Sequence, residues 1–173
     1  MLEGPVINVR VMEREELPLI TKWGNDPKFG GEFEPIGQNS LHEMEKWYSN
    51  LRPGEKWFII EKKDGTKIGQ IIHSPVRHYL QIGFTIIPEE RSKGYCTEAV
   101  RIMVDYIFMS RDILRVEALT NSENTASRKI LENAGFTKEG VVRKSIFARG
   151  KWHDGVLYSI LREEWKEPKI LKD

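Results

Sequence analysis

The chain has 173 residues and a mass of 20.2 kDa, the size of one ordinary domain. Its 27 basic and 26 acidic residues leave a net charge of +1, which disfavours general nucleic-acid binding. One cysteine excludes an intramolecular disulfide and disfavours a zinc cluster, and no apolar run approaches the ~20 residues of a membrane span. We therefore expect a cytoplasmic protein with one domain over 1–173, a core at about 6–165, and a charged, solvated C-terminal extension over 166–173.

The first third of the chain predicts a strand and two helices. Residues 6–11 alternate with period two, which is typical of a strand, and residues 13–23 have the apolar spacing of a helix. Residues 24–38 are rich in glycine and proline and predict a loop. Ser40 and Glu43 then match a capping box, which predicts that a second helix begins there.

The rest of the chain alternates between the two periodicities. In chain order, the expected elements are strands at 57–60, 68–72 and 79–87, a helix at 94–109, a strand at 115–119, a helix at 125–133, and two strands within 136–162. This order predicts an α/β (α+β) fold with a mixed, mostly antiparallel sheet of about seven strands and helices on both of its faces.

The segment that follows the third of these strands carries the chemical signal. The strand ends at Pro88, and a short basic turn with Gly94 leads directly into the long helix. The first N–H groups of a helix lack partners and lie at the positive end of its dipole, and Arg91 and Lys93 add charge. The pattern favours a phosphate site, although an ordinary turn with solvated basic residues is the alternative. The Walker and dinucleotide-binding motifs are absent, which disfavours kinases and dehydrogenases.

Several motifs, in order, resemble those of the GNAT superfamily of N-acetyltransferases. Residues 91–96 resemble its Q/R-x-x-G-x-G/A motif, residues 120–127 its N-x-x-S helix start, and residues 133–136 its K-x-G-F ending. Residues 150–160 resemble the RimJ/RimL branch, which acetylates ribosomal-protein N-termini. The resemblance implies the GNAT fold and acetyl transfer from acetyl-CoA to a primary amine, by direct attack in a ternary complex and without a metal. Two kinds of acceptor are compatible with the resemblance, a protein N-terminal α-amine and a small-molecule amine.

The resemblance also implies which residues bind acetyl-CoA. Backbone groups of the strand before the motif would contact the pantetheine arm, and the motif loop would hold the pyrophosphate with its amides. Asn124 would hold the arm where the central strands part, and Arg128 would reach the far end of the donor. The expected donor-binding residues are Phe84, Thr85, Ile86, Arg91, Ser92, Lys93, Gly94, Tyr95, Cys96, Thr97, Asn124 and Arg128.

The acid and the base are less directly implied. Many family members use a tyrosine as the acid where this chain has Leu131, so Ser127, which matches a serine implicated in the ribosomal-protein branch, is the candidate acid. Its alternative role is a helix-start hydroxyl bonded to backbone. Related strands often carry a glutamate where this chain has Gln81. Glu34 is therefore the candidate base, with Glu32 and His73 as alternatives, although a carboxylate in this loop is often only solvated.

These departures keep a second hypothesis open, a non-catalytic acyl-CoA-binding or regulatory module on the same fold. The sequence does not identify the acceptor or establish that the acyl group is strictly acetyl, and aromatic residues in the last strands leave room for a homodimer. Cys96 is expected in the phosphate turn, with its pKa lowered by the helix start.

Overall fold

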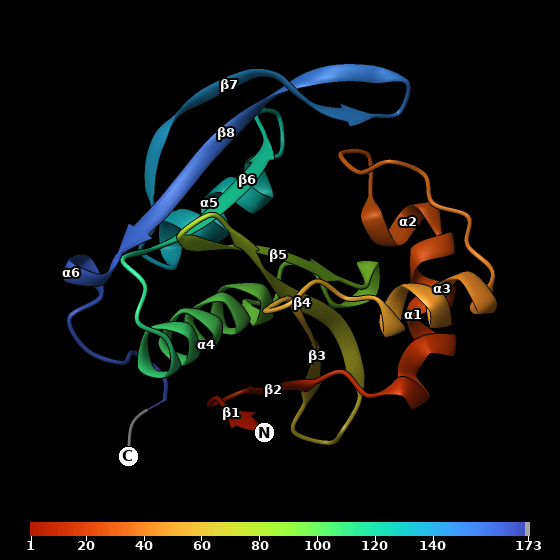
Figure 1. Ribbon diagram of the computed structural model, residues 1–173, viewed down its shortest axis with the longest axis horizontal. Coiled ribbons are helices and arrows are strands. Elements are labelled where there is room, and N and C mark those ends of the chain that lie inside the picture. The colour runs from red at the N-terminus through yellow and green to blue at the C-terminus, as the bar shows by residue number, and fades with distance from the viewer. Residues whose placement is uncertain (172–173) are drawn as a thin grey trace.

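The computed structural model describes residues 1–171, which form an eight-stranded sheet in the order β1-β2-β3-β4-β5-β6-β8-β7 (Figure 1). All neighbouring strands are antiparallel except β5 and β6, which are parallel. The strands are β1 (Leu2–Glu3), β2 (Ile7–Val11), β3 (Lys56–Lys62), β4 (Lys67–Val76), β5 (Tyr79–Ile86), β6 (Arg115–Asn121), β7 (Thr137–Ala148) and β8 (Lys151–Leu161). The mixed, mostly antiparallel sheet is thus confirmed, and the additional strand is the two-residue β1.

The helices follow the predicted order, with two short α-helices added. They are the 3-10 turn η1 (Arg14–Glu16), α1 (Leu17–Asn25), α2 (Pro27–Gly30), α3 (Leu41–Ser49), the 3-10 turn η2 (Pro88–Glu90), α4 (Tyr95–Ser110), α5 (Thr125–Asn133) and α6 (Arg162–Trp165). The capping box at α3 is confirmed, because Ser40 Oγ accepts from the Glu43 amide while the Glu43 carboxylate accepts from the Ser40 amide. The additions are α2, a single turn inside the segment predicted as a loop, and α6, a single turn that follows β8.

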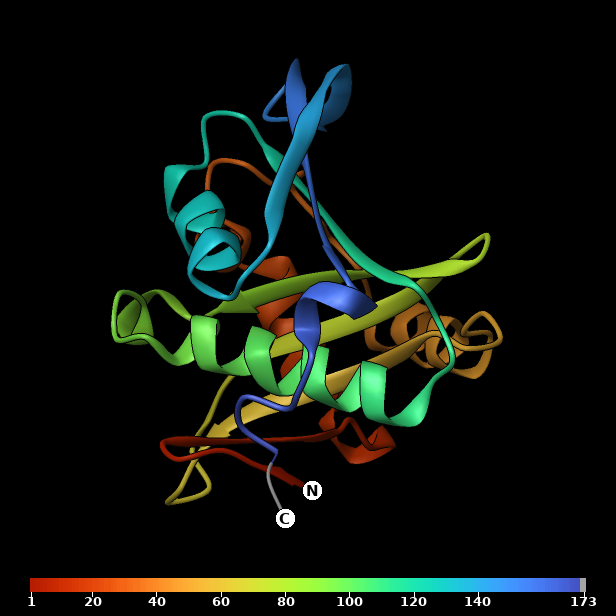
Figure 2. The same ribbon diagram turned by 90° about the vertical axis from the view of Figure 1, so that its left-hand side faces the viewer.

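Helices cover both faces of the sheet, as Figure 2 shows with α4 in front of the strands and α1 behind them. The alternation along β3 gives the reason, because successive side chains of a strand point to opposite faces. Phe58 and Ile60 belong to the larger core, which includes α4, whereas Ile59 packs with Leu17 and Trp23 of α1. The prediction of helices on both faces is therefore confirmed.

The C-terminal segment does not extend into solvent as expected. The guanidinium of Arg162 donates to the carbonyls of Phe108 (3.1 Å) and Ile113 (2.8 Å), which ties α6 to the end of α4. Asp105 of α4 is fully buried, and its carboxylate accepts from Trp165 Nε1 (2.8 Å) and from the Ile170 amide (2.6 Å). The tail is thus anchored to α4 up to residue 171, while Lys166, Glu167 and Lys169 are exposed as predicted. Residues 172–173 lie outside the described residues.

In the part of the chain that the structure describes, none of the helices is both long and apolar enough to cross a membrane.

Candidate active site

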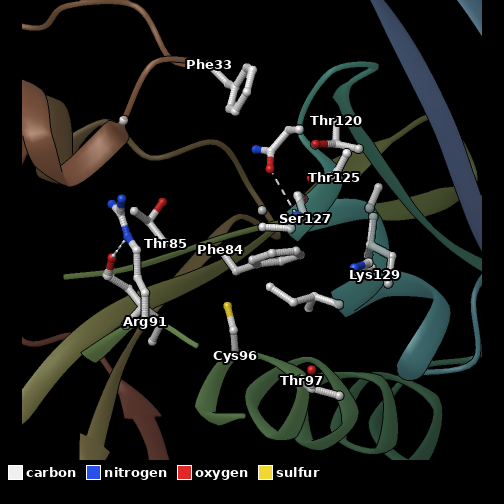
Figure 3. Close-up of a pocket in the computed structure, with 18 of the residues that line it drawn as sticks. Phe33, Phe84, Thr85, Arg91, Cys96, Thr97, Thr120, Thr125, Ser127 and Lys129 are labelled. Carbon is white, nitrogen blue, oxygen red and sulfur yellow. Dashed lines mark hydrogen bonds between the residues drawn. The ribbon is translucent and has the colours of Figure 1, made fainter. Parts of the chain in front are cut away.

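A pocket opens where the two parallel strands at the centre of the sheet separate. β5 and β6 pair only at Leu80 with Val116 and Gln81 with Glu117, after which β6 stays paired with β8 along its whole length. Between the separated strands, the first turn of α4, helix α5 and the loop after α2 lies a cavity of about 790 Å³ (Figure 3). The separation of β5 and β6 thus creates a site in which both backbone groups and side chains are exposed to a ligand.

The β5 wall of this pocket is an open strand edge. Within residues 1–171, the edge of 82–86 that faces β6 has no strand partner, and all five residues line the cavity. The Phe84 side chain points into the cavity and lies between Ser127 and Cys96 (Figure 3). Thr85 and Ile86 line the same wall, so the structure brings together the three β5 residues that the sequence predicted. An extended ligand could bond to such an edge as an added strand does.

The opposite end of the pocket is closed by the turn that leads into α4. Left-handed backbone at Ser92 (φ 62°) and Gly94 (φ 84°) directs the chain sharply into the 16-residue helix. Among the described residues, and apart from Gly94 and its chain neighbours, no heavy atom lies within 4 Å of the position that a Cβ at Gly94 would take. Residues 94–97 line the pocket, so the first turn of α4 borders it at the positive end of the helix dipole. This arrangement suits a phosphate group.

The basic side chains of this turn contribute less than the sequence suggested. Lys93 Nζ lies 2.8 Å from the carboxylate of Glu90, which Lys62 also contacts at 3.3 Å. Arg91 also lines the pocket, but its guanidinium donates to backbone carbonyls, among them those of Ile86 (3.0 Å) and Phe29 (2.6 Å). Both basic side chains thus have partners within the protein, which leaves the backbone amides as the main anion-binding groups of this turn.

The cysteine in this turn lies where the sequence placed it, but its ionisation differs from the prediction. Cys96 is the second residue of α4, and its sulfur points toward Phe84 inside the pocket (Figure 3). Burial raises the pKa of the Cys96 thiol to about 12, against a smaller lowering from the charge of Arg91. The expected lowering of the pKa by the helix start is therefore wrong, because loss of hydration outweighs the nearby positive charge.

Helix α5 presents a different face to the pocket than its sequence suggested. Asn124 Oδ1 accepts from the Ser127 amide (3.0 Å), so Asn124 caps the helix, and the Ser127 side chain, which lines the pocket, is not the cap. Arg128 does not line the pocket, because its guanidinium donates to Tyr158 Oη (3.3 Å) and to the Ser122 carbonyl (3.2 Å). This corrects the expectation that Arg128 would reach the donor.

Sequence reasoning missed Lys129, which lines the pocket on α5 beside Ser127. Helical spacing contained the signal, because Lys129 and Ile130 lie three and four residues after Ala126, and Asn133 lies four and three residues after them, and all four line the cavity. Thr120 of β6 was also missed, since the separation of β5 and β6 that exposes it is a property of the sheet and not of the local sequence.

The candidate base lies at the mouth of the pocket. Glu34 lines it together with Glu32 and Phe33, in the loop that follows α2. The Glu34 side chain is exposed as a whole, yet the protein around its carboxyl partly desolvates it and raises its pKa. A carboxylate with a raised pKa is a better proton acceptor near neutral pH.

His73, the other alternative for the base, lies outside the pocket. It is fully buried, and its ring packs against both Phe58 and Tyr106, with centroids 5.7 Å and 6.2 Å away. Burial lowers its pKa to about 4. Leu131, in contrast, lines the cavity and offers only methyl groups. In the described residues 1–171, no three His, Cys, Asp or Glu side chains form a group that could hold a metal ion.

Comparison with known proteins agrees with this architecture. The family model for the acetyltransferase (GNAT) domain matches residues 7–137. A probable N-acetyltransferase of Bacillus subtilis, YjcK, is 31% identical over an alignment 181 positions long. The alignment covers 95% of this chain and 98% of the relative.

Two solved structures share the fold. Spermidine N-acetyltransferase from Vibrio cholerae, in complex with CoA and spermine, superposes with a TM-score of 0.81 at 21% identity and covers 93% of this chain and 98% of its own. RimJ from Mycobacterium smegmatis, in complex with CoA-disulfide, gives a TM-score of 0.82 at 24% identity and covers 95% of this chain and 89% of its own.

Proposed function

The chain belongs to the GNAT acetyltransferase family, and from this premise we propose that it transfers an acetyl group from acetyl-CoA to a primary amine by direct attack in a ternary complex. The observation that carries the proposal is the open edge of β5 between the start of α4 and the loop after α2. An extended arm with a phosphate at one end and a reactive group at the other fits this edge. Acetyl-CoA supplies such an arm, with an activated thioester at its end.

The donor would be held mainly by backbone. In the proposal, the open edge of Phe84, Thr85 and Ile86 binds the pantetheine arm, and the amides from Gly94 to Thr97 bind the pyrophosphate. Asn124 uses its Oδ1 as the helix cap, which leaves its side-chain NH₂ group for the arm. Lys129 replaces Arg128 as the cation of α5 that can approach the donor.

The amine must lose a proton, and the thiolate that leaves must gain one. We assign the first proton to Glu34, whose raised pKa and position at the pocket mouth suit a base. A backbone N–H of the open β5 edge would donate to the carbonyl oxygen as negative charge develops there. Ser127 lines the pocket beside Phe84 and would return a proton to the sulfur.

The acceptor is proposed as either a protein N-terminal α-amine or a small-molecule amine. Relatives named for both kinds exist, among them spermidine N(1)-acetyltransferase of Escherichia coli and putative ribosomal N-acetyltransferase YdaF of Bacillus subtilis. The carboxylates of Glu32 and Glu34 at the mouth favour a cationic acceptor of either kind. The homodimer and the cytoplasmic location stay predictions from the sequence.

A turnover assay tests the proposal. Thiol release from acetyl-CoA is followed with free-N-terminus peptides, polyamines and amino acids, and acetyl-CoA affinity is measured by calorimetry. We expect micromolar to millimolar affinity for the donor and turnover with at least one amine class. Binding of acetyl-CoA without turnover across the panel would instead favour the regulatory module, for which Leu131 and Gln81 are the supporting departures. Absence of donor binding would contradict both functions.

A further inference from the structure

Two arginines from distant parts of the chain meet on the short helix α2. Arg91 Nη2 donates to the carbonyls of Lys28 (3.0 Å) and Phe29 (2.6 Å), while its Nε donates to the carbonyl of Ile86 (3.0 Å). Arg149 Nη2 donates to the carbonyls of Pro27 (2.9 Å) and Gly31 (2.8 Å). Four backbone carbonyls of one turn are thus bonded by two guanidinium groups.

This turn needs such partners, because a helix of only four residues pairs only its first carbonyl, that of Pro27, with an amide of its own turn, that of Gly31. The two arginines that supply them come from distant places. Arg91 lies in the turn that leads into α4, 62 residues from Phe29, and Arg149 lies at the tip of the β7–β8 hairpin, 118 residues from Gly31. Figure 1 shows the hairpin arching across to α2. The bonds therefore bridge three separate elements around the pocket.

The same turn determines where the candidate base lies. Gly31 has left-handed backbone (φ 78°), and a Cβ at Gly30 would lie 2.9 Å from Glu34 Cβ, so the chain folds back tightly from α2 into the loop with Glu34. Residues 30–34 all line the pocket. Any shift of α2 is thus passed to the side chains at the pocket mouth.

We propose that Arg91 and Arg149 are positioning residues, which hold α2 and residues 30–34 at the mouth of the pocket and set the affinity for the acceptor. Arg91 does not act as a ligand of the donor's phosphates. The inference rests on the proposed function in one respect, namely that residues 30–34 border the path of the acceptor. Because Arg91 also bonds to Ile86 at the end of the open β5 edge, it links the β5 wall of the pocket to α2 and residues 30–34.

The chemistry of arginine supports this role over phosphate binding. Both Nε and Nη2 of Arg91 are committed to carbonyls on two different elements, a bridge that needs the rigid fork of a guanidinium. Lysine carries the same charge as a single ammonium and cannot span both elements. Arg91→Lys therefore separates the two roles, because it retains the charge and removes the bridge.

The experiment compares Arg91→Lys, Arg91→Met and Arg149→Met with the control Lys93→Met, which removes a charge from the same turn without a bond to α2. Amide hydrogen exchange of residues 26–34 and the Kd for acetyl-CoA are measured on the intact protein. Acceptor KM is measured with the amine of highest turnover. In all three arginine variants we expect amide exchange in residues 26–34 to accelerate about tenfold, because each variant loses one or two charge-assisted hydrogen bonds to α2. Acceptor KM should rise about tenfold, with the donor Kd changed by less than about twofold.

Lys93→Met should leave exchange in 26–34 unchanged. The proposal is overturned if Arg91→Lys matches the wild type while Arg91→Met weakens acetyl-CoA binding, since charge alone would then matter. Unaltered exchange in both methionine variants would equally overturn it. If no amine is turned over by the wild type, the proposed function fails, whereas the exchange and donor-affinity measurements still decide whether the two arginines hold α2.

Discussion

Gly94→Glu tests the assigned phosphate turn most directly. Gly94 has a φ of 84°, where an L side chain costs about 1–2 kcal/mol of stability, which for a chain of this size is roughly 2–8 °C in Tm. No steric cost adds to this, because among the described residues, its neighbours aside, nothing lies within 4 Å of the new Cβ. A carboxylate about 5 Å from a phosphate charge costs roughly 3 kcal/mol at an effective dielectric constant of about 20. The Kd for acetyl-CoA should therefore rise about 100-fold or more.

Calorimetric titration with acetyl-CoA and thermal unfolding measure the two effects separately. Gly65 provides a matched control, because it has a φ of 82°, and within the described chain it too has nothing within 4 Å of a Cβ apart from its neighbours. It lies in the β3–β4 hairpin turn and not in the pocket wall. Gly65→Glu should lower Tm by a similar amount with unchanged affinity, and Gly94→Gln should weaken binding less than Gly94→Glu. Equal affinities in Gly94→Glu and Gly65→Glu would refute the assignment of the turn.

Three further predictions follow from groups in and beneath the pocket. Ser127→Ala should lower kcat about 100-fold, as the loss of a general acid does, with little change in the Kd for acetyl-CoA; equal losses in both would make Ser127 a binding residue. The pKa of His73 is about 4 in the folded protein and 6.5 in the unfolded chain, so the unfolded state binds the proton first as pH falls. The free energy of unfolding should therefore drop by about 2 kcal/mol between pH 7 and pH 5. Urea titrations should show this drop reduced in His73→Leu, and an undiminished drop would contradict it. Iodoacetamide should label Cys96 at pH 8 at least about 100-fold more slowly than a free thiol and more slowly still with acetyl-CoA, whereas rapid labelling would contradict the raised pKa.

The sequence predicted most of the fold because the signals for helices, strands and turns lie in residues close together along the chain. The period-two alternation of β2 and the capping box at Ser40 and Glu43 depend on residues a few positions apart, and both are confirmed. The turn from Ser92 to Gly94 was also recognisable, since a glycine before a long helix has a specific backbone use. Helix α2 was missed because four residues carry too little periodicity to be distinguished from a loop.

The roles of individual side chains followed the sequence less closely. The sequence placed Arg91, Cys96 and Arg128 near the donor by motif and spacing, but their bonds and ionisation depend on groups that only the tertiary structure brings near them. Arg91 finds its partners in α2, Arg128 turns to Tyr158 on β8, and the thiol of Cys96 is desolvated by the surrounding pocket. The order of elements and the turn that leads into α4 could thus be predicted from the sequence, because both arise from neighbours along the chain. The charges that face the pocket could not, because hydrogen bonding and desolvation depend on residues 30 to 120 positions away, which the fold brings together.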